Sequence, residues 1–172
     1  MEMNQSNVQE NPDLLSPLTL AFIGDGVYEL LVRQYIVEKG NCSVKKLHGQ
    51  KVEFVRCETQ AKVLAELIYP VLSEKEQDIC LRGRNAHVGH IPKNASVADY
   101  HGATALEALF GWLYLKGEQE RIQELFSLIA VSYTHQMCIR DRCWTGRKDI
   151  LRRVFLWGSD RLSKNTGKLC CF

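Results

Sequence analysis

Apolar residues recur every three or four positions along most of the chain, which is the spacing that places them on one face of an α-helix. The first such segment covers 17–39, where Ser16 and Pro17 give a helix start and Gly40 interrupts the pattern. A second helix is expected after Asn41 or Ser43. Further helices are expected at 52–69, at 74–82 behind a cap at Ser73, from Ser96 or Asp99 to 116, and at 118–129. Alternating β-strand patterns are nearly absent, so the sequence predicts an all-α fold with six or seven helices.

Three stretches depart from this pattern. Residues 1–13 are polar and are expected to form a flexible leader to a single domain at 14–129. Residues 83–94 are rich in glycine, proline and asparagine without a clean period, so we expect a loop there. Residues 130–172 contain frequent cysteine, arginine and tryptophan, and helical periodicity does not carry through them coherently.

The tail at 130–172 is unusual in its sequence. The segment VSYTHQMCIRDR, at 131–142, resembles peptides that arise when sequencing-adapter DNA is translated at the end of a gene. We therefore expect that this tail is not native to the protein. The alternative is a basic C-terminal extension that binds nucleic acid, although it is too short for an ordinary double-stranded-RNA-binding domain.

Charge distribution limits the choice of function. The tail holds nine of the 22 basic residues and three of the 20 acidic ones, so residues 1–129 carry a net charge of −4 within a chain of +2. A slightly acidic body is not a general nucleic-acid binder, and an action on RNA would require local basic groups or metal ions.

The sequence also indicates where the protein works. No apolar run is long enough to span a membrane, and the N-terminus lacks the basic and apolar regions of a secretory signal, so the expected location is the cytoplasm. None of the seven cysteines forms a C-x-x-C pair, and His87, His90 and His101 share no helical spacing. A zinc site is therefore not expected.

Asp25 lies inside the apolar helix at 17–39, between Gly24 and Gly26. Each mid-helix glycine costs about 1 kcal/mol relative to alanine, so two of them suggest that another helix or a ligand approaches this backbone closely. Asp25 and Glu29 are one turn apart, and a hard cation would relieve their repulsion. Alternatively, Glu29 simply points to solvent.

Glu107 is the single charged residue in the apolar segment 102–115. A carboxylate on a helix that is apolar all round is expected to be buried, and buried carboxylates are paired, protonated or metal-bound. The alternative is a hydrogen bond to a core tyrosine or to an arginine. Two acids on two packed helices, Asp25 and Glu107, would suit Mg²⁺, which keeps several of its waters when it binds to a protein. A bound Mg²⁺ promotes the hydrolysis of phosphodiesters.

The loop region after the fourth expected helix is the best local basic patch. Its candidate RNA-binding residues are Arg82, Arg84, Asn85, His87 and Lys93, with His90 between the last two. Basic loops suit phosphate contacts, and duplex RNA is recognised mainly through its shape, phosphates and 2′-hydroxyls. The alternative is an ordinary solvated loop.

Four segments follow one another in order within residues 13–129: LAFIGDGVYE at 20–29, RGRNA at 82–86, IPKN at 91–94 and TALEALFGWLYL at 104–115. Together they resemble the ribonuclease III family, and within it the minimal bacterial branch, Mini-ribonuclease III. The resemblance implies a homodimeric, all-helical endonuclease that cleaves double-stranded RNA with Mg²⁺, leaves 5′-phosphate and 3′-hydroxyl ends, and matures large-subunit ribosomal RNA. It maps the catalytic, metal-binding acids of the family onto Asp25 and Glu107.

The chain departs from the larger members of this family at two positions. They carry a glutamate where this chain has Ala21 and an acid where it has Thr104, so the number of metal ions in the site stays open. Glu29 or Glu58 is a hypothetical substitute. Besides an endonuclease, the sequence allows a catalytically silent module that binds duplex RNA or the ribosome, and a helical scaffold that dimerises.

Overall fold

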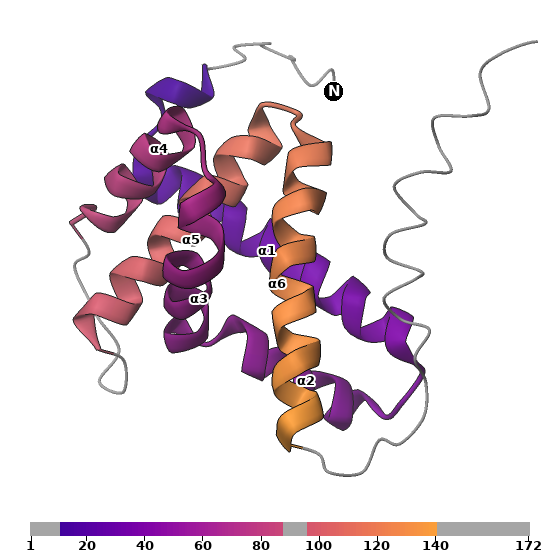
Figure 1. Ribbon diagram of the computed structural model, residues 1–172. Helices are drawn as coiled ribbons and strands as arrows, with labels where there is room; N and C mark the ends of the chain where they lie inside the picture. The colour runs from indigo at the N-terminus through magenta and orange to yellow at the C-terminus, as the bar shows by residue number, and fades with distance from the viewer. Residues whose placement is uncertain (1–10, 88–95, 141–172) are drawn as a thin grey trace, which may run out of the picture. The chain divides into compact units, whose positions relative to one another are not determined.

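The computed structural model describes residues 11–87 and 96–140, with side chains described up to Tyr133 in the second range. These residues form six α-helices and no strand, so the predicted all-α class is confirmed (Figure 1). The helices are Pro17–Lys39 (α1), Val44–Val55 (α2), Cys57–Val63 (α3), Glu74–Arg84 (α4), Val97–Leu115 (α5) and Gln119–Arg140 (α6). None of them is long and apolar enough to cross a bilayer. Residues 1–10 of the leader predicted at 1–13, residues 88–95, which include the segment 91–94, and residues 141–172 lie outside the described residues.

The chain divides after Thr134 into two units, and the packing described below is that of the first. Its central helix is α5, against which α1, α3 and α4 pack (Figure 1). Ten residues of α5 between Ala103 and Leu113 are buried, as expected for a helix that is apolar on nearly all sides. The helix begins where Ser96 accepts a hydrogen bond from the backbone N–H of Asp99.

The first helix has the bounds that its sequence predicts. Ser16 accepts a hydrogen bond from the backbone N–H of Thr19 at 3.1 Å, and Pro17 occupies the first turn. Proline is favoured there because backbone N–H groups in the first turn of a helix have no intrahelical acceptor. The missing N–H of proline therefore costs no hydrogen bond.

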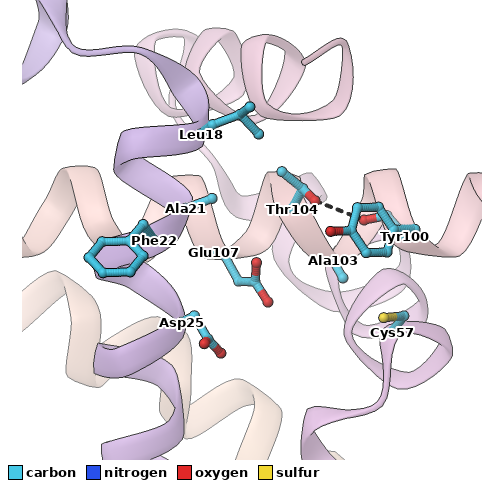
Figure 2. A pocket seen from close by; sticks show the side chains of 9 residues that line it. All are labelled: Leu18, Ala21, Phe22, Asp25, Cys57, Tyr100, Ala103, Thr104 and Glu107. Atoms are coloured by element: carbon cyan, nitrogen blue, oxygen red, sulfur yellow. Dashed lines mark hydrogen bonds between the residues drawn. The ribbon is translucent and has the colours of Figure 1, made fainter. Parts of the chain in front are cut away.

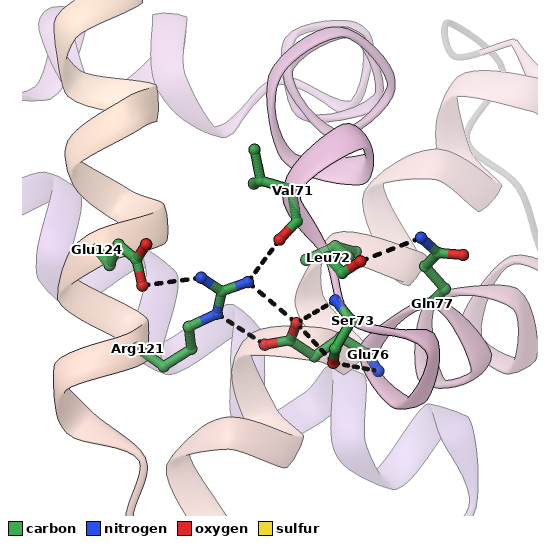
Figure 3. Close-up of polar contacts among 7 residues, drawn as sticks. All are labelled: Val71, Leu72, Ser73, Glu76, Gln77, Arg121 and Glu124. Atoms are coloured by element: carbon green, nitrogen blue, oxygen red, sulfur yellow. Dashed lines mark hydrogen bonds and ion pairs between the residues drawn. The ribbon is translucent and has the colours of Figure 1, made fainter.

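A network of charged groups joins α4 to α6 (Figure 3). Glu76 closes a capping box with Ser73 at the start of α4. Arg121 of α6 donates from Nε to Glu76 at 2.8 Å and from another nitrogen to the carbonyl of Val71, also at 2.8 Å. Its third nitrogen pairs with Glu124. The arginine therefore fixes α6 to the cap of α4 and to the turn that precedes it.

A second polar network holds the segment before α1 against α4 and α5. The indole N–H of Trp112 donates to the Asp13 carboxylate at 2.7 Å, and Lys75 pairs with the same carboxylate at 3.3 Å. Arg82 donates to the backbone carbonyls of Asp13 and Leu15 at 3.0 and 2.7 Å. These contacts hold Asp13 and Leu15 against the domain.

Two helices differ from their predicted extents. The helix expected at 52–69 is interrupted at Arg56, whose extended backbone (φ −65°, ψ 138°) separates α2 from α3; a π-helical turn, Leu64–Ile68, and a 3₁₀ turn, Tyr69–Val71, follow α3. The helix expected to end near residue 129 continues to Arg140. Tyr133, beyond that expected end, is buried and stacks on Phe54 with 3.8 Å between ring centroids.

Candidate active site

The site is built on a close crossing of α1 and α5. A Cβ atom placed on Gly24 would lie 1.7 Å from the carbonyl oxygen of Glu107, and one on Gly111 would lie 2.0 Å from the carbonyl oxygen of Leu20. The two backbones therefore touch, and no side chain fits at either glycine. Gly24 is explained by the approach of another helix, one of the two reasons that the sequence suggested. Gly26 has nothing within 4 Å of such a Cβ atom.

The crossing places Asp25 and Glu107 in one open pocket with a volume of about 340 Å³. Figure 2 shows both carboxylates on the pocket side of the helices that carry them. The structure therefore brings together the two acids predicted from the sequence. Other residues of α1, α3 and α5 complete the lining: Leu18, Ala21, Phe22, Cys57, Tyr100, Ala103 and Thr104.

Two carboxylates bring negative charge into this pocket, and none of the ion pairs among the described residues involves either of them. Burial, and next the charge of Asp25, raise the pKa of Glu107 to about 7, against a hydrogen bond from Gln60 that lowers it. Within residues 11–87 and 96–133, no lysine, arginine or histidine forms an ion pair with Asp25 or Glu107. A bound cation would relieve the repulsion between the two carboxylates.

Oxygen ligands from two carboxylates fit Mg²⁺, which retains several waters and needs few protein ligands. Ala21 and Thr104 line the same pocket, so the two positions where larger relatives carry acids face this site without a carboxylate. The Thr104 hydroxyl donates to the backbone carbonyl of Tyr100 at 3.0 Å. In the described part of the chain, no group of three or more His, Cys, Asp or Glu residues could hold a metal. Among the described residues, the acids that line this site are Asp25 and Glu107.

The two acids suggested as substitutes do not line the pocket. Glu29 pairs with Arg33 on its own helix and with Lys51 of α2 at 3.0 Å. Hydrogen bonds from Arg33 and then Lys51 lower the pKa of Glu29. Basic side chains therefore hold Glu29, and Glu58 is exposed on α3.

The candidate RNA-binding residues fall into two environments. Arg82 is partly buried and directs its guanidinium at backbone carbonyls within the domain, whereas Arg84, Asn85 and His87 are exposed at the end of α4. Lys93, with His90, lies outside the described residues.

Three residues near the acids were not singled out from the sequence. Cys57 and Tyr100 line the pocket, and Gln60 contacts Glu107 from α3. Gln60 carried a usable signal, because it is a polar residue on the same helical stripe as the apolar Val63 and Leu64. Tyr100 lies seven residues before Glu107 and so on the same helical stripe, whereas nothing in its sequence context distinguishes Cys57 from an ordinary core residue.

Comparison with known proteins is consistent across sequence and structure. Residues 18–118 match the model of the ribonuclease III domain. Curated Mini-ribonuclease 3 proteins are similar to the chain: that of Symbiobacterium thermophilum is 44% identical over 70% of this chain and 92% of its own length. That of Brevibacillus brevis is 43% identical over 72% and 91%, respectively. A crystal structure of a Fusobacterium nucleatum protein superposes with a TM-score of 0.63 at 29% identity, covering 72% of this chain and 95% of that one.

Proposed function

Because the chain belongs to the ribonuclease III family and is an endoribonuclease, we propose that it hydrolyses double-stranded RNA with Mg²⁺ at Asp25 and Glu107. The products carry 5′-phosphate and 3′-hydroxyl ends. One observation supports this above all: two carboxylates from crossed helices meet in an open pocket, and no basic side chain within 11–87 and 96–133 forms an ion pair with either.

The two acids, the helix crossing beneath them and the candidate RNA-binding residues each have a part in this proposal. Asp25 and Glu107 hold Mg²⁺, which when bound supplies positive charge for the scissile phosphate and acidifies a water. The Gly24–Gly111 crossing sets the separation of the two acids through the backbone. Arg84, Asn85, His87 and Lys93 contact the phosphates and sugars of the duplex.

The proposed substrate is precursor large-subunit ribosomal RNA, as the resemblance to the minimal branch of the family implies. This would place the protein in the cytoplasm of a bacterium, where ribosomal RNA is made. A precursor with a double-stranded processing stem is therefore the RNA to test first.

We also propose that the protein acts as a homodimer. Leu18, Phe22, Gly26 and Leu30 are spaced by four residues and form one row along α1. The three side chains of this row are exposed, with 80% of Phe22 and 64% of Leu30 accessible, and Gly26 has nothing near it. A self-complementary apolar row of this kind suits the two-fold contact of a second copy.

The function is tested by incubating the protein with duplex RNA in Mg²⁺ and in EDTA. Cleavage in Mg²⁺ alone is expected. Asp25→Asn should remove detectable cleavage while the helical circular dichroism stays unchanged. Asp78→Asn, which changes an exposed aspartate of α4, is the matched control and should cleave normally.

Other outcomes of this experiment are equally informative. A gel shift without cleavage would identify a silent duplex-RNA-binding module, and no interaction would leave a scaffold. Full activity in the folded Asp25→Asn variant would contradict the proposed site.

A further inference from the structure

Gln60 is a fully buried polar residue beside the site, with 1% of its surface accessible. It belongs to α3, one residue before Ala61. A Cβ atom on Gly102 of α5 would lie only 2.6 Å from the Cβ atom of Ala61, so α3 and α5 are in close contact at this level. The position of Gln60 relative to α5 is therefore set by helix packing.

A hydrogen bond from the Gln60 side chain lowers the pKa of Glu107, and Gln60 is not among the buried side chains of the described residues that lack a hydrogen-bond partner. Gln60 is not among the residues that line the pocket, to which α3 contributes Cys57. It therefore approaches the Glu107 carboxylate from the core and not from the space that a ligand would occupy. A buried amide without a hydrogen-bond partner is costly, which makes this contact a fixed part of the fold.

We propose that Gln60 is a positioning residue whose amide NH₂ donates to one carboxylate oxygen of Glu107 and directs the other oxygen toward a divalent cation beside Asp25. The direction of donation follows from chemistry, because an ionised carboxylate only accepts. This inference rests on the proposed metal-dependent function.

The choice of an amide suits a site with few acids. An arginine or lysine in this position would form an ion pair with Glu107 and compete with the metal for its charge. A neutral donor orients the carboxylate and leaves its negative charge available. Because Ala21 and Thr104 supply no carboxylate, the orientation of Glu107 decides much of the affinity for metal.

The proposal is tested with Gln60→Met, which keeps the length of the side chain and removes the donor. The readouts are the Mg²⁺ concentration for half-maximal cleavage and the binding of Mn²⁺ followed by electron paramagnetic resonance. We expect both midpoints to rise by about 10- to 100-fold, the usual effect of losing an outer partner of a metal ligand.

Gln77→Met is the matched control. The Gln77 amide donates to the carbonyl of Leu72 at 3.1 Å, within the part-buried turn before α4. The control should keep wild-type midpoints for both metals. Unchanged midpoints in Gln60→Met would overturn the proposal and leave Gln60 with a role in packing alone.

Failure of the proposed function can be distinguished from failure of the proposal for Gln60. Wild-type protein that binds Mn²⁺ through Asp25 but cleaves no RNA would contradict the function, and the Mn²⁺ midpoints would still test Gln60. Wild-type protein that binds no Mn²⁺ would overturn both.

A measurement on the wild-type chain covers the case in which Gln60→Met does not fold. Bound Mn²⁺ should broaden the side-chain NH₂ resonances of Gln60 in nitrogen-15 spectra and spare those of Gln77. Sharp Gln60 resonances at saturating Mn²⁺ would overturn the proposal.

Discussion

Arg82 and Arg84 are two residues apart in α4, yet their side chains have different surroundings. Arg82 is partly buried and donates to the backbone carbonyls of Asp13 and Leu15. Arg84 is exposed at the end of the helix. The sequence suggested RNA contacts for both, whereas the geometry gives Arg82 a role within the domain.

This difference predicts opposite effects of two substitutions. Arg82→Ala should lower the free energy of unfolding by about 1.5–3 kcal/mol, because hydrogen bonds made by a charged group are lost. Arg84→Ala should change stability by less than about 0.5 kcal/mol. It should weaken RNA binding and reduce the slope of log affinity against log salt by about one.

Urea denaturation and RNA binding at several salt concentrations measure these two effects. A stable Arg82→Ala variant with weakened RNA binding would show that Arg82 contacts RNA after all.

At the residue scale, the sequence predicted the site residues whose polar or charged side chains conflict with their apolar sequence surroundings. Asp25 between glycines and Glu107 in an apolar helix are such conflicts, and both lie in the pocket. The structural role of Arg82 was not predictable, because its acceptors are backbone carbonyls 67 and 69 residues away. Any residue can supply a carbonyl, so the sequence carries no signal for that contact.

At the level of elements, the crossing of α1 and α5 depends on two glycines. Gly24→Ala should destabilise the protein by several kcal/mol or prevent folding, because the new Cβ atom would collide with the backbone of Glu107. Gly49→Ala is the control. Gly49 lies inside α2 with nothing within 4 Å of a Cβ atom. Alanine there should raise the free energy of unfolding by about 1 kcal/mol.

Thermal and urea unfolding of both variants would measure the contrast. Equal stability of Gly24→Ala and the wild type would mean that the helices separate at little cost, and it would contradict the close crossing.

The contact between α4 and α6 predicts that the free energy of unfolding depends on pH. Burial by itself would raise the pKa of Glu76, but hydrogen bonds from Arg121 and Ser73 outweigh it and lower the pKa below the ordinary value of 4.5. A carboxyl with a lowered pKa in the folded state stabilises the fold above its ordinary pKa. That stabilisation is lost as the pH falls through the lowered value.

Glu76→Gln should therefore lower the free energy of unfolding at neutral pH by about 2–3 kcal/mol. The difference from the wild type should shrink as the pH falls below 4.5, the ordinary pKa of the group. Urea denaturation from about pH 7 to about pH 3 measures this. A difference that stays constant across that range would show that protonation of Glu76 is not involved.

Helix bounds were predictable where local chemistry marks them. The caps at Ser16 and Ser96 and the apolar runs behind them predicted α1 and α5 closely. The break at Arg56 was missed because a single extended residue, with no glycine or proline, ends α2. Phe54 before the break and Gln60 after it are both buried.

At the scale of the whole molecule, α6 extends into the basic tail expected at 130–172. The predicted boundary at residue 129 falls inside this helix, and the residues just beyond it have contacts with the domain. Tyr35 donates to the carbonyl of Ala130 at 3.0 Å, and Tyr133 donates to the carbonyl of Glu53 at 3.2 Å. That the tail at 130–172 is not native to the protein stays a prediction.

Dimerisation predicts a change in molecular mass for a substitution in the exposed row of α1. Leu30→Glu places a charge in that row, away from the pocket, and should shift the protein from dimer to monomer in light scattering. Val44→Glu is the control, because Val44 is 80% accessible on a different helix. It should leave the mass unchanged. A monomeric wild type, or a dimeric Leu30→Glu variant, would contradict the proposed contact.

The backbone contact at Gly24 and Gly111 also restricts motion. Helices that pack through long side chains can slide by small amounts, because the side chains change rotamer to follow. Here carbonyl groups meet glycine backbones, and no side chain is present to absorb such a shift. We therefore expect the backbones that carry Asp25 and Glu107 to keep their separation when a substrate binds, and any accompanying rearrangement to take place in other segments of the chain.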